Sequence, residues 1–246
     1  MRALVVLPSY NERENVIPIA EAILAQSAEL HVCIVDDSSP DGTSEHVRAV
    51  LAAHPEWQER ITLITRAKKG GRGGAVREGL AWGVRQGAQF RCYIEMDCDF
   101  SHDPSAIDAG YARVLGGADV VVGARYPAGT IIGWPAGRRA FSFLANALAR
   151  IAIDRSVADY TNGFRFYSPR AVDHIIHHEQ QHHGYIYLSE TLSLLLRAGM
   201  RVESFPIVFK NRERGVSNTN LAEIRAALGG LASIAWRHRF DRTRGR

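Results

Sequence analysis

Residues 91–104, Arg-Cys-Tyr-Ile-Glu-Met-Asp-Cys-Asp-Phe-Ser-His-Asp-Pro, combine a mostly apolar run with two closely spaced aspartates. The apolar run predicts a buried strand, and Asp97 and Asp99 follow where that strand leaves the sheet. Ligands in open α/β sheets bind at the carboxyl ends of strands, where an Asp-x-Asp pair offers hard oxygen ligands for Mg²⁺ or Mn²⁺ holding a diphosphate. A polar turn before a helix that begins at Asp103 and Pro104 is the alternative interpretation of the same residues.

The segments around this stretch alternate between apolar strands and amphipathic helices. Further strands are expected at 3–7, 31–35, 61–65, 119–123, 160–167 and 201–209. Helices are expected at 16–27, 47–51, 74–86, 107–115, 138–151, 171–176, 185–198 and 221–236. Strands that alternate with helices of this length predict an α/β protein with a mostly parallel central sheet and helices on both faces.

The composition indicates a folded globular chain. Its 246 residues are 46% hydrophobic and 23% charged, which excludes a disordered protein and allows a sizeable core. The sequence contains no run of 18 apolar residues that could cross a membrane. Its apolar N-terminal run is too short for a signal peptide, so we expect a cytoplasmic protein. Cys33, Cys92 and Cys98 lie in or beside expected strands, which favours buried, reduced thiols.

Two basic segments lie outside the expected strands. Residues 66–74 place Lys68, Lys69 and Arg72 among glycines that lead into a helix, a pattern that suits phosphate binding through backbone N–H groups. A flexible basic loop explains this segment equally well. Residues 237–246 contain five arginines and one aspartate, which suits an anionic membrane surface, nucleic acid or simple solvation.

The helix expected at 138–151 has a broad apolar face. Core packing is the expected role for most of that face, which contains Phe141, Phe143, Leu144, Ala147, Leu148 and Ile151. A Gly/Pro-rich segment, 127–137, precedes the helix and carries Trp134. Such a loop in front of an apolar helix is also suited to admitting a hydrophobic substrate.

Six motifs occur in a fixed order along the chain. They are Pro8-Ser9-Tyr10-Asn11-Glu12, Asp36-Asp37-Ser38-Ser39-Pro40-Asp41-Gly42-Thr43, Met96-Asp97-Cys98-Asp99-Phe100-Ser101-His102, Gly123-Ala124-Arg125-Tyr126, Thr161-Asn162-Gly163-Phe164-Arg165 and Asn211-Arg212-x-x-Gly215-x-Ser217. Together with Gly133-Trp134-x-x-x-Arg138-x-x-x-Ser142, this order resembles that of dolichyl-phosphate mannosyltransferases, which are inverting family 2 glycosyltransferases. The resemblance extends from about residue 3 to residue 235.

The resemblance implies a GT-A fold, that is, a Rossmann-like nucleotide-diphospho-sugar transferase. It implies a single catalytic domain, 1–236, that ends in an amphipathic helix and is followed by the basic tail 237–246. The implied reaction moves mannose from GDP-mannose to dolichyl or polyprenyl phosphate, with Mg²⁺ or Mn²⁺. A UDP-glucose donor, a different acceptor, and a degenerate nucleotide-binding or membrane-docking module remain open alternatives.

The same resemblance assigns roles to matching positions. The residues expected to line the nucleoside pocket are Pro8, Tyr10, Glu12, Val35 and Asp37, with Asp97 and Cys98 near the ribose and diphosphate. The metal ligands implied are Asp99, Ser101 and Asp97. The acceptor phosphate is expected at Arg125, Arg138 and Ser142, and the donor diphosphate at Arg212, with Asn218 where relatives carry lysine.

Asp99, Arg125 and Arg138 are the residues expected to carry catalysis. A phosphate monoester has its second pKa near 6 and is already largely anionic at neutral pH, so the acceptor needs no protein base. The two arginines are expected to orient this phosphate for in-line attack with inversion at the anomeric carbon.

The acceptor also implies how the protein meets its surroundings. A polyprenyl chain lies in a bilayer, so we expect peripheral association with the cytoplasmic face of a membrane or with a membrane partner subunit, and no nucleic acid partner. The helix at 221–236, followed by arginines, suits interfacial binding. A helix packed on the domain explains the same periodicity.

Asn218, which stands where relatives carry lysine, gives the first testable prediction. If the absence of this lysine weakens the set of cations that holds the donor diphosphate, here called the clamp, Asn218→Lys will tighten donor binding because it restores a cation beside the phosphates. Isothermal titration with GDP-mannose measures the dissociation constant. An unchanged or weaker dissociation constant would count against this account of the clamp.

Overall fold

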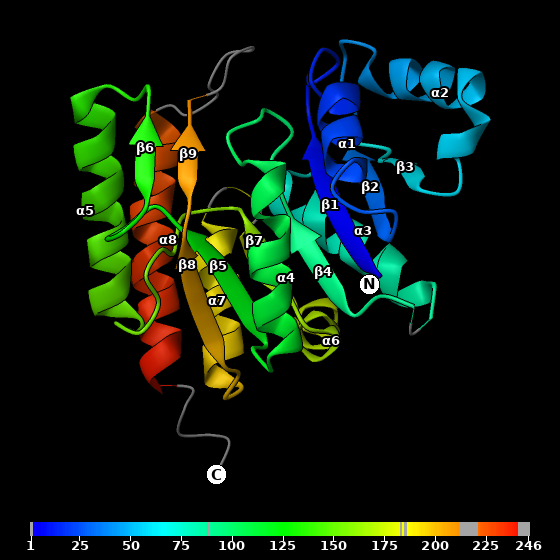
Figure 1. Ribbon diagram of the computed structural model, residues 1–246. Helices are drawn as coiled ribbons and strands as arrows, with labels where there is room; N and C mark the ends of the chain where they lie inside the picture. Colours follow the sequence, from blue (N-terminus) through cyan, green and yellow to red (C-terminus); the bar gives the residue numbers. More distant parts are fainter. Residues whose placement is uncertain (1, 88, 183, 185, 212–220, 241–246) are drawn as a thin grey trace.

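A seven-stranded sheet forms the centre of the computed structural model, which describes residues 2–87, 89–182, 184, 186–211 and 221–240 (Figure 1). The strand order is β3-β2-β1-β4-β7-β5-β8. These strands are β1 (Ala3–Ser9), β2 (Leu30–Asp36), β3 (Ile61–Thr65), β4 (Cys92–Glu95), β5 (Val120–Ala124), β7 (Arg165–Tyr167) and β8 (Val202–Pro206). A separate two-stranded sheet pairs β6 (Thr130–Ile132) with β9 (Val208–Lys210).

The strands of the large sheet are parallel except for β7, which runs antiparallel to both β4 and β5. The prediction of a mostly parallel sheet is therefore confirmed. In the parallel part, Val6 of β1 pairs with Glu95 of β4, and Ser9 pairs with Asp36 of β2. The loops that follow β1, β2 and β4 therefore leave the sheet at the same edge.

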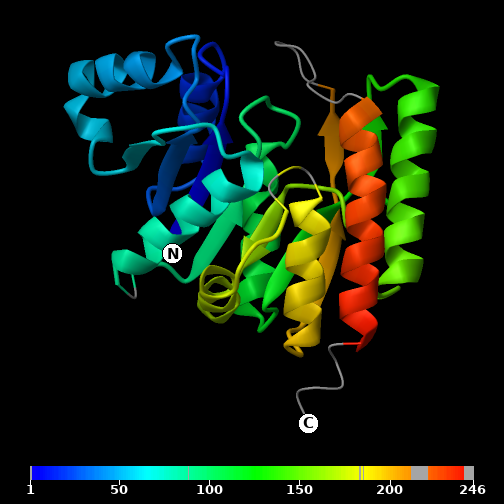
Figure 2. The same ribbon diagram turned by 180° about the vertical axis from the view of Figure 1, so that it is seen from behind.

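Helices cover both faces of this sheet, as Figures 1 and 2 show from opposite sides. One apolar cluster joins the sheet to α1 (Val16–Leu24), α2 (Thr43–Ala53) and α4 (Ile107–Leu115). A second cluster joins the other face to α3 (Arg72–Arg85), α5 (Ala136–Ala152), α6 (Pro169–His177), α7 (Tyr187–Arg197) and α8 (Leu221–Phe240). Two short 3₁₀ helices, η1 (Pro55–Trp57) and η2 (Pro104–Ala106), complete the described elements.

Two glycines allow α3 to approach β1 closely. A Cβ at Gly79 would lie 2.5 Å from Val6 Cγ1, and one at Gly83 would lie 2.4 Å from Leu4 Cδ2. These distances are shorter than any side chain tolerates, so α3 needs glycine at both positions. The close approach places the first residue of α3, Arg72, over the end of β4.

Several expected boundaries were wrong because tertiary contacts decide them. The strand expected at 160–167 is reduced to β7, and the strand expected at 201–209 is divided into β8 and β9 in different sheets. The Gly/Pro-rich segment contains β6, which no apolar pattern predicted. The helix expected from Gly74 begins at Arg72, and the last helix continues to Phe240, into the expected tail.

The apolar face of α5 differs most from expectation. Phe141, Phe143, Leu144, Leu148 and Ile151 are all at least 40% exposed, so the prediction that most of this face packs in the core was wrong. In contrast, Leu231 and Ile234 of α8 are buried, which supports the interpretation of that helix as one packed on the domain.

Two further expectations concern cysteines and membrane spans. Cys33, Cys92 and Cys98 are all free and buried, as expected. Across the part of the chain that the structure describes, no helix has both the length and the apolar character needed to cross a bilayer.

Candidate active site

The residues expected to bind a nucleoside lie together at the common edge of β1, β2 and β4. The Asp37 N–H donates to the Ser9 carbonyl oxygen at 2.9 Å, and the Cys98 thiol donates to the Pro8 carbonyl oxygen at 3.5 Å. Parallel pairing thus brings three loops that are distant in sequence into contact. Tyr10 and Glu12 follow Pro8 in the first of these loops, and Val35 is buried at the end of β2.

Asp37 holds the glycine-rich segment at the start of α3. Its carboxylate accepts hydrogen bonds from the Gly70 N–H at 2.9 Å and the Gly71 N–H at 2.7 Å, and it pairs with the Arg66 guanidinium. These two N–H groups are therefore bound by a protein carboxylate, contrary to the phosphate-binding interpretation of the segment. Lys69 Nζ lies 3.6 Å from the centroid of the Tyr10 ring and ties the segment to the β1 loop.

The second aspartate of the Asp-x-Asp pair, Asp99, lies beside a cavity of about 430 Å³. Asp99 is 7% exposed and lines this cavity with Asn15, Phe100 and Lys210, among others. The Ser101 N–H donates to Asp99 Oδ1 at 3.1 Å, which fixes the turn after β4. Asp103 accepts a hydrogen bond from the Ser105 N–H at 2.9 Å and caps the turn that begins at Pro104, as expected.

A buried histidine connects this turn to the far half of the sheet. The Asp97 N–H donates to His102 Nδ1 at 3.2 Å, so Nε2 carries the ring hydrogen and donates to Asn162 Oδ1 at 3.0 Å. Asn162 Nδ2 in turn donates to the Gly123 carbonyl oxygen at the end of β5. The His102 ring stacks on Phe164, with a centroid distance of 5.2 Å. This connection fixes the backbone of Asp97 relative to β5.

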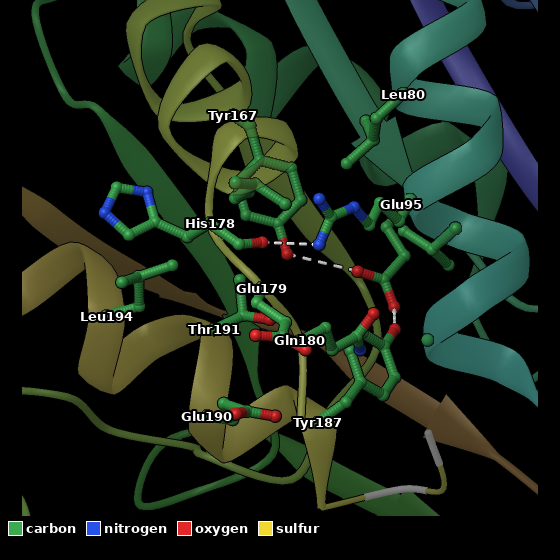
Figure 3. Close-up of a pocket in the computed structure, with 14 residues that line it drawn as sticks. Leu80, Glu95, Tyr167, His178, Glu179, Gln180, Tyr187, Glu190, Thr191 and Leu194 are labelled. Atoms are coloured by element: carbon green, nitrogen blue, oxygen red, sulfur yellow. Dashed lines mark hydrogen bonds between the residues drawn. The ribbon is translucent and has the colours of Figure 1, made fainter. Parts of the chain in front are cut away.

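A buried charge cluster behind Asp97 was missed by the sequence analysis. The Glu95 side chain is 0% exposed and accepts hydrogen bonds from the Tyr167 and Tyr187 hydroxyls and from Arg72 Nη1. Figure 3 shows Glu95 between the two tyrosines. The three side chains line a small cavity of about 30 Å³. Arg72 also donates to Asp97 Oδ1, from Nε at 3.1 Å and from Nη2 at 2.6 Å.

The sequence did contain a signal for this cluster. Glu95 and Asp97 are two residues apart, so they project to the same face of an extended chain. A carboxylate inside an otherwise apolar strand run also requires a buried partner. The partner, Arg72, lies 23 residues before Glu95, and only the packing of α3 on the sheet brings the two together.

Arginines and an indole ring form the other half of the site. Arg125, at the end of β5, is 5% exposed and binds the buried Asp159 through Nε at 2.8 Å and Nη2 at 3.0 Å. The Trp134 ring centroid lies 5.6 Å from Arg125 Cζ and 4.1 Å from Arg138 Cζ. Ser142 lies one helical turn after Arg138 on α5.

The Arg125–Asp159 pair is charged on both sides. Burial alone would raise the pKa of Asp159, but the charge and hydrogen bonds of Arg125 and the Thr161 N–H outweigh it and hold this pKa below its ordinary value. Burial likewise favours a lower pKa for Arg125, but the Asp159 charge raises it. Among contacts with described residues, Arg125 Nη1 makes no hydrogen bond, so this group is the one suited to meet a ligand.

Metal binding by the described residues alone is incomplete. No group of three or more His, Cys, Asp or Glu side chains that suits a metal ion occurs within the described ranges. Asp97 and Asp99, with the Ser101 hydroxyl, offer hard oxygens, and Mg²⁺ commonly takes one or two carboxylates and completes its shell with phosphate oxygens and water. The set therefore fits an ion that binds together with a diphosphate. Arg212 and Asn218, the remaining expected site residues, lie outside the described residues.

Comparison with known proteins places this geometry in a family. Residues 4–176 match the model of glycosyl transferase family 2. The chain belongs to glycosyl transferase family 2. This family 2 chain is 35% identical over 245 residues to a polyprenol monophosphomannose synthase of Mycolicibacterium smegmatis, covering 99% of the chain and 91% of that relative. It is 32% identical over 219 residues to an undecaprenyl-phosphate mannosyltransferase of Micrococcus luteus, covering 88% and 87% of the two chains.

Solved structures of other transferases share the fold of this family 2 chain. A glucosyl-3-phosphoglycerate synthase of Mycobacterium tuberculosis in complex with UDP gives a TM-score of 0.65 at 17% identity, over 96% of this chain and 80% of that one. A mannosyltransferase from Pyrobaculum calidifontis, in complex with GDP-Man and Mn²⁺, gives 0.61 at 17% identity, over 95% and 69% of the two chains. The GT-A architecture expected from the sequence is thereby confirmed.

Replacing Asp159 tests the buried pair. Asp159→Asn leaves the buried Arg125 guanidinium without a counter-charge, so the free energy of unfolding at pH 7 should fall by about 3–5 kcal/mol. Because the folded-state pKa of Asp159 is depressed, its contribution is fully present above the unfolded-state value of about 3.9 and is lost as pH falls through the folded-state pKa. Urea unfolding of wild type and Asp159→Asn at several pH values measures this. The difference between their free energies of unfolding should be constant from pH 7 to about 4 and should become smaller below pH 4. A pH-independent difference would contradict this assignment.

Proposed function

We propose that this family 2 glycosyltransferase moves mannose from GDP-mannose to a polyprenyl phosphate such as dolichyl phosphate, with inversion, to give polyprenyl-phosphate-mannose. The observation that carries the proposal is the 35% identity to a polyprenol monophosphomannose synthase across 99% of this chain. The arginine and indole cluster beside the Asp-x-Asp turn supports it, because a phosphate acceptor needs cations next to the donor site.

On the donor side, the three strand-end loops provide the nucleotide site. Pro8, Tyr10, Glu12 and Val35 would contact the nucleoside, with Asp37 fixing the wall of the pocket through the segment at Gly70 and Gly71. Asp97 and Cys98 would lie nearest the ribose and diphosphate. Arg212 and Asn218, which the structure does not describe, are the further residues expected at the diphosphate. Hydrogen bonds that join its loops would hold the wall of this site in place.

Asp99, Asp97 and Ser101 would hold Mg²⁺ or Mn²⁺. When bound, the ion would neutralise the charge that develops on the departing nucleoside diphosphate. The chain contributes carboxylate oxygens whose turn is fixed by the Ser101 N–H and by His102. Fixed ligands of this kind favour the transition state because they need no reorganisation during the reaction.

On the acceptor side, Arg138, Arg125 and Ser142 would bind and orient the phosphate. Arg138 lies over the Trp134 ring, whereas Arg125 is anchored by Asp159 and offers Nη1. The phosphate is anionic at neutral pH and attacks without a general base on the protein. Positioning of this nucleophile is then the main contribution of the arginines to the rate.

The catalytic domain, 1–236 with the tail 237–246, would reach its lipid acceptor at the cytoplasmic face of a membrane. The exposed stripe on α5, at Phe141, Leu144, Leu148 and Ile151, provides an apolar surface next to Arg138, and Phe143 adds to it. Figures 1 and 2 show α5 at the outer edge of the molecule, beside α8. An apolar stripe with arginines near it suits an interfacial helix on anionic lipid. A membrane partner subunit covering the same surface is the other arrangement expected from the sequence.

The proposed reaction is tested by a donor and acceptor assay. Purified protein with Mn²⁺ and polyprenyl phosphate is incubated separately with labelled GDP-mannose and labelled UDP-glucose, and lipid-linked product is extracted. We expect product from GDP-mannose alone, at least 10³-fold less product with Asp99→Ala, and loss of metal dependence in that variant. Product from UDP-glucose alone would identify the glucosyl alternative, and no product from either donor would favour a nucleotide-binding module. Normal turnover in the presence of a chelator would contradict the metal role.

Membrane binding through α5 is tested with vesicles. Phe143→Ser combined with Ile151→Ser should reduce sedimentation with anionic liposomes at least tenfold, because burial of each large apolar side chain contributes roughly 1.5–3 kcal/mol. Leu115→Ser is the matched control, since Leu115 is 50% exposed on α4, in the opposite helix layer. Equal partitioning of the double variant and the control would contradict a role for α5. Removal of residues 241–246 separately measures the contribution of the last three of the five arginines in the tail.

A further inference from the structure

We infer that Arg72 and Glu95 are positioning residues that hold the Asp97 carboxylate in place at the nucleotide site. The inference rests on the proposed function, because it assigns to Asp97 a role near the donor diphosphate. It concerns two residues outside the set assigned above to the nucleoside, the metal ion and the acceptor phosphate. Their effect on the reaction would be exerted through Asp97 alone.

Glu95 is the buried anchor of this arrangement. Its side chain has no exposed surface, yet it lies at the last position of a central strand. Tyr167 Oη donates to Glu95 Oε2 at 3.1 Å, and the Tyr187 hydroxyl and Arg72 Nη1 donate to Oε1. A carboxylate removed from water needs such partners, and three elements, α3, α7 and β7, provide them.

Arg72 connects this anchor to Asp97. Its Nη1 binds Glu95, while its Nε and Nη2 bind Asp97 Oδ1 at 3.1 and 2.6 Å. The guanidinium is planar and rigid, so it cannot keep both acids bound if either carboxylate turns. Because Glu95 is fixed in the core, Arg72 fixes the direction of the Asp97 side chain, which is 28% exposed at the site.

The surroundings of Arg72 are built to keep its guanidinium in one place. A Cβ on Gly163 would lie 2.5 Å from Arg72 Nη2, so the loop after Asn162 packs directly on the guanidinium, and a side chain there would displace it. Asn162 binds His102, and His102 accepts the backbone N–H of Asp97. The loop at Asn162 and Gly163 thus fixes Asp97 in two ways. It holds the Asp97 side chain through Arg72 and the Asp97 backbone through His102.

Stability alone does not account for this pair. Replacing a buried ion pair by apolar residues of similar volume is often neutral or stabilising, whereas removal of one partner is strongly destabilising. Two leucines would therefore remove both buried charges together, and the folding cost that remains is that of the Tyr167 and Tyr187 hydroxyls, which lose their acceptor. What leucines cannot provide is a fixed cation on Asp97, which orients that carboxylate and offsets its repulsion of a diphosphate.

A single and a double variant separate the contribution of the pair to folding from its contribution to the orientation of Asp97. Arg72→Leu leaves Glu95 buried without a cation and should lower the urea midpoint, and Arg72→Leu with Glu95→Leu should restore much of it. The double variant should still bind GDP in the presence of Mn²⁺ about tenfold more weakly than wild type by calorimetry. Its kcat/KM with GDP-mannose should fall by a similar factor or more.

Two further variants complete the test. Glu190→Gln removes a carboxylate from the same small cavity without touching Arg72, so its GDP affinity should equal that of wild type. Glu95→Gln keeps the shape of the anchor, and it should weaken GDP binding several-fold even where the double variant does not fold.

The outcomes distinguish the inference from the proposed function. A double or Glu95→Gln variant that binds GDP with Mn²⁺ as tightly as wild type, while wild type transfers mannose, overturns the positioning role alone. A wild-type protein that binds no GDP overturns the proposed function and the inference with it.

Discussion

The parallel pairing of β2, β1 and β4 is the constraint on which the site depends. Parallel strands end at the same edge, so the loops carrying Glu12, Asp37, Asp97 and Asp99 are forced together. This edge collects acidic side chains in a space from which water is partly excluded. Such a concentration of like charge is tolerated only where cations or hydrogen-bond donors oppose it.

The chain meets this requirement with arginines that pair with acidic residues near the ends of three strands. Arg66 opposes Asp37 at the end of β2, Arg72 opposes Glu95 and Asp97 at the end of β4, and Arg125 opposes Asp159 at the end of β5. Pairs of this kind add little to the free energy of folding, because desolvation offsets most of the attraction. Their planar hydrogen bonds instead fix geometry, which is what a site for a charged diphosphate and a charged acceptor needs.

The antiparallel strand β7 connects the two halves of the site. Its first residue, Arg165, is fully buried and donates to the carbonyl oxygens of Tyr160, Asn162 and Leu188. These bonds shape the loop that brings Asp159 to Arg125 and Asn162 to His102. One buried cation therefore organises contacts to Arg125 and to the Asp-x-Asp turn. The same loop also contacts α5, because the Tyr160 N–H donates to Asn146 Oδ1 at 2.8 Å.

The sequence by itself determined the alternation of strands and helices apart from β6 and the division of β8 from β9, the mostly parallel sheet, the strand-end positions of Asp37, Asp97 and Arg125, and the family. Those features follow from local periodicity and short motifs, which a chain carries whatever its neighbours in space. The partners of the charged residues were decided only by the tertiary structure. Glu95 finds Arg72, Tyr167 and Tyr187, and Asp159 finds Arg125, across separations that no local pattern encodes. The same holds for α5, whose periodicity predicts an apolar face but cannot say whether protein or solvent covers it. Burial and charge pairing depend on which elements meet, and the packing of the whole chain settles that.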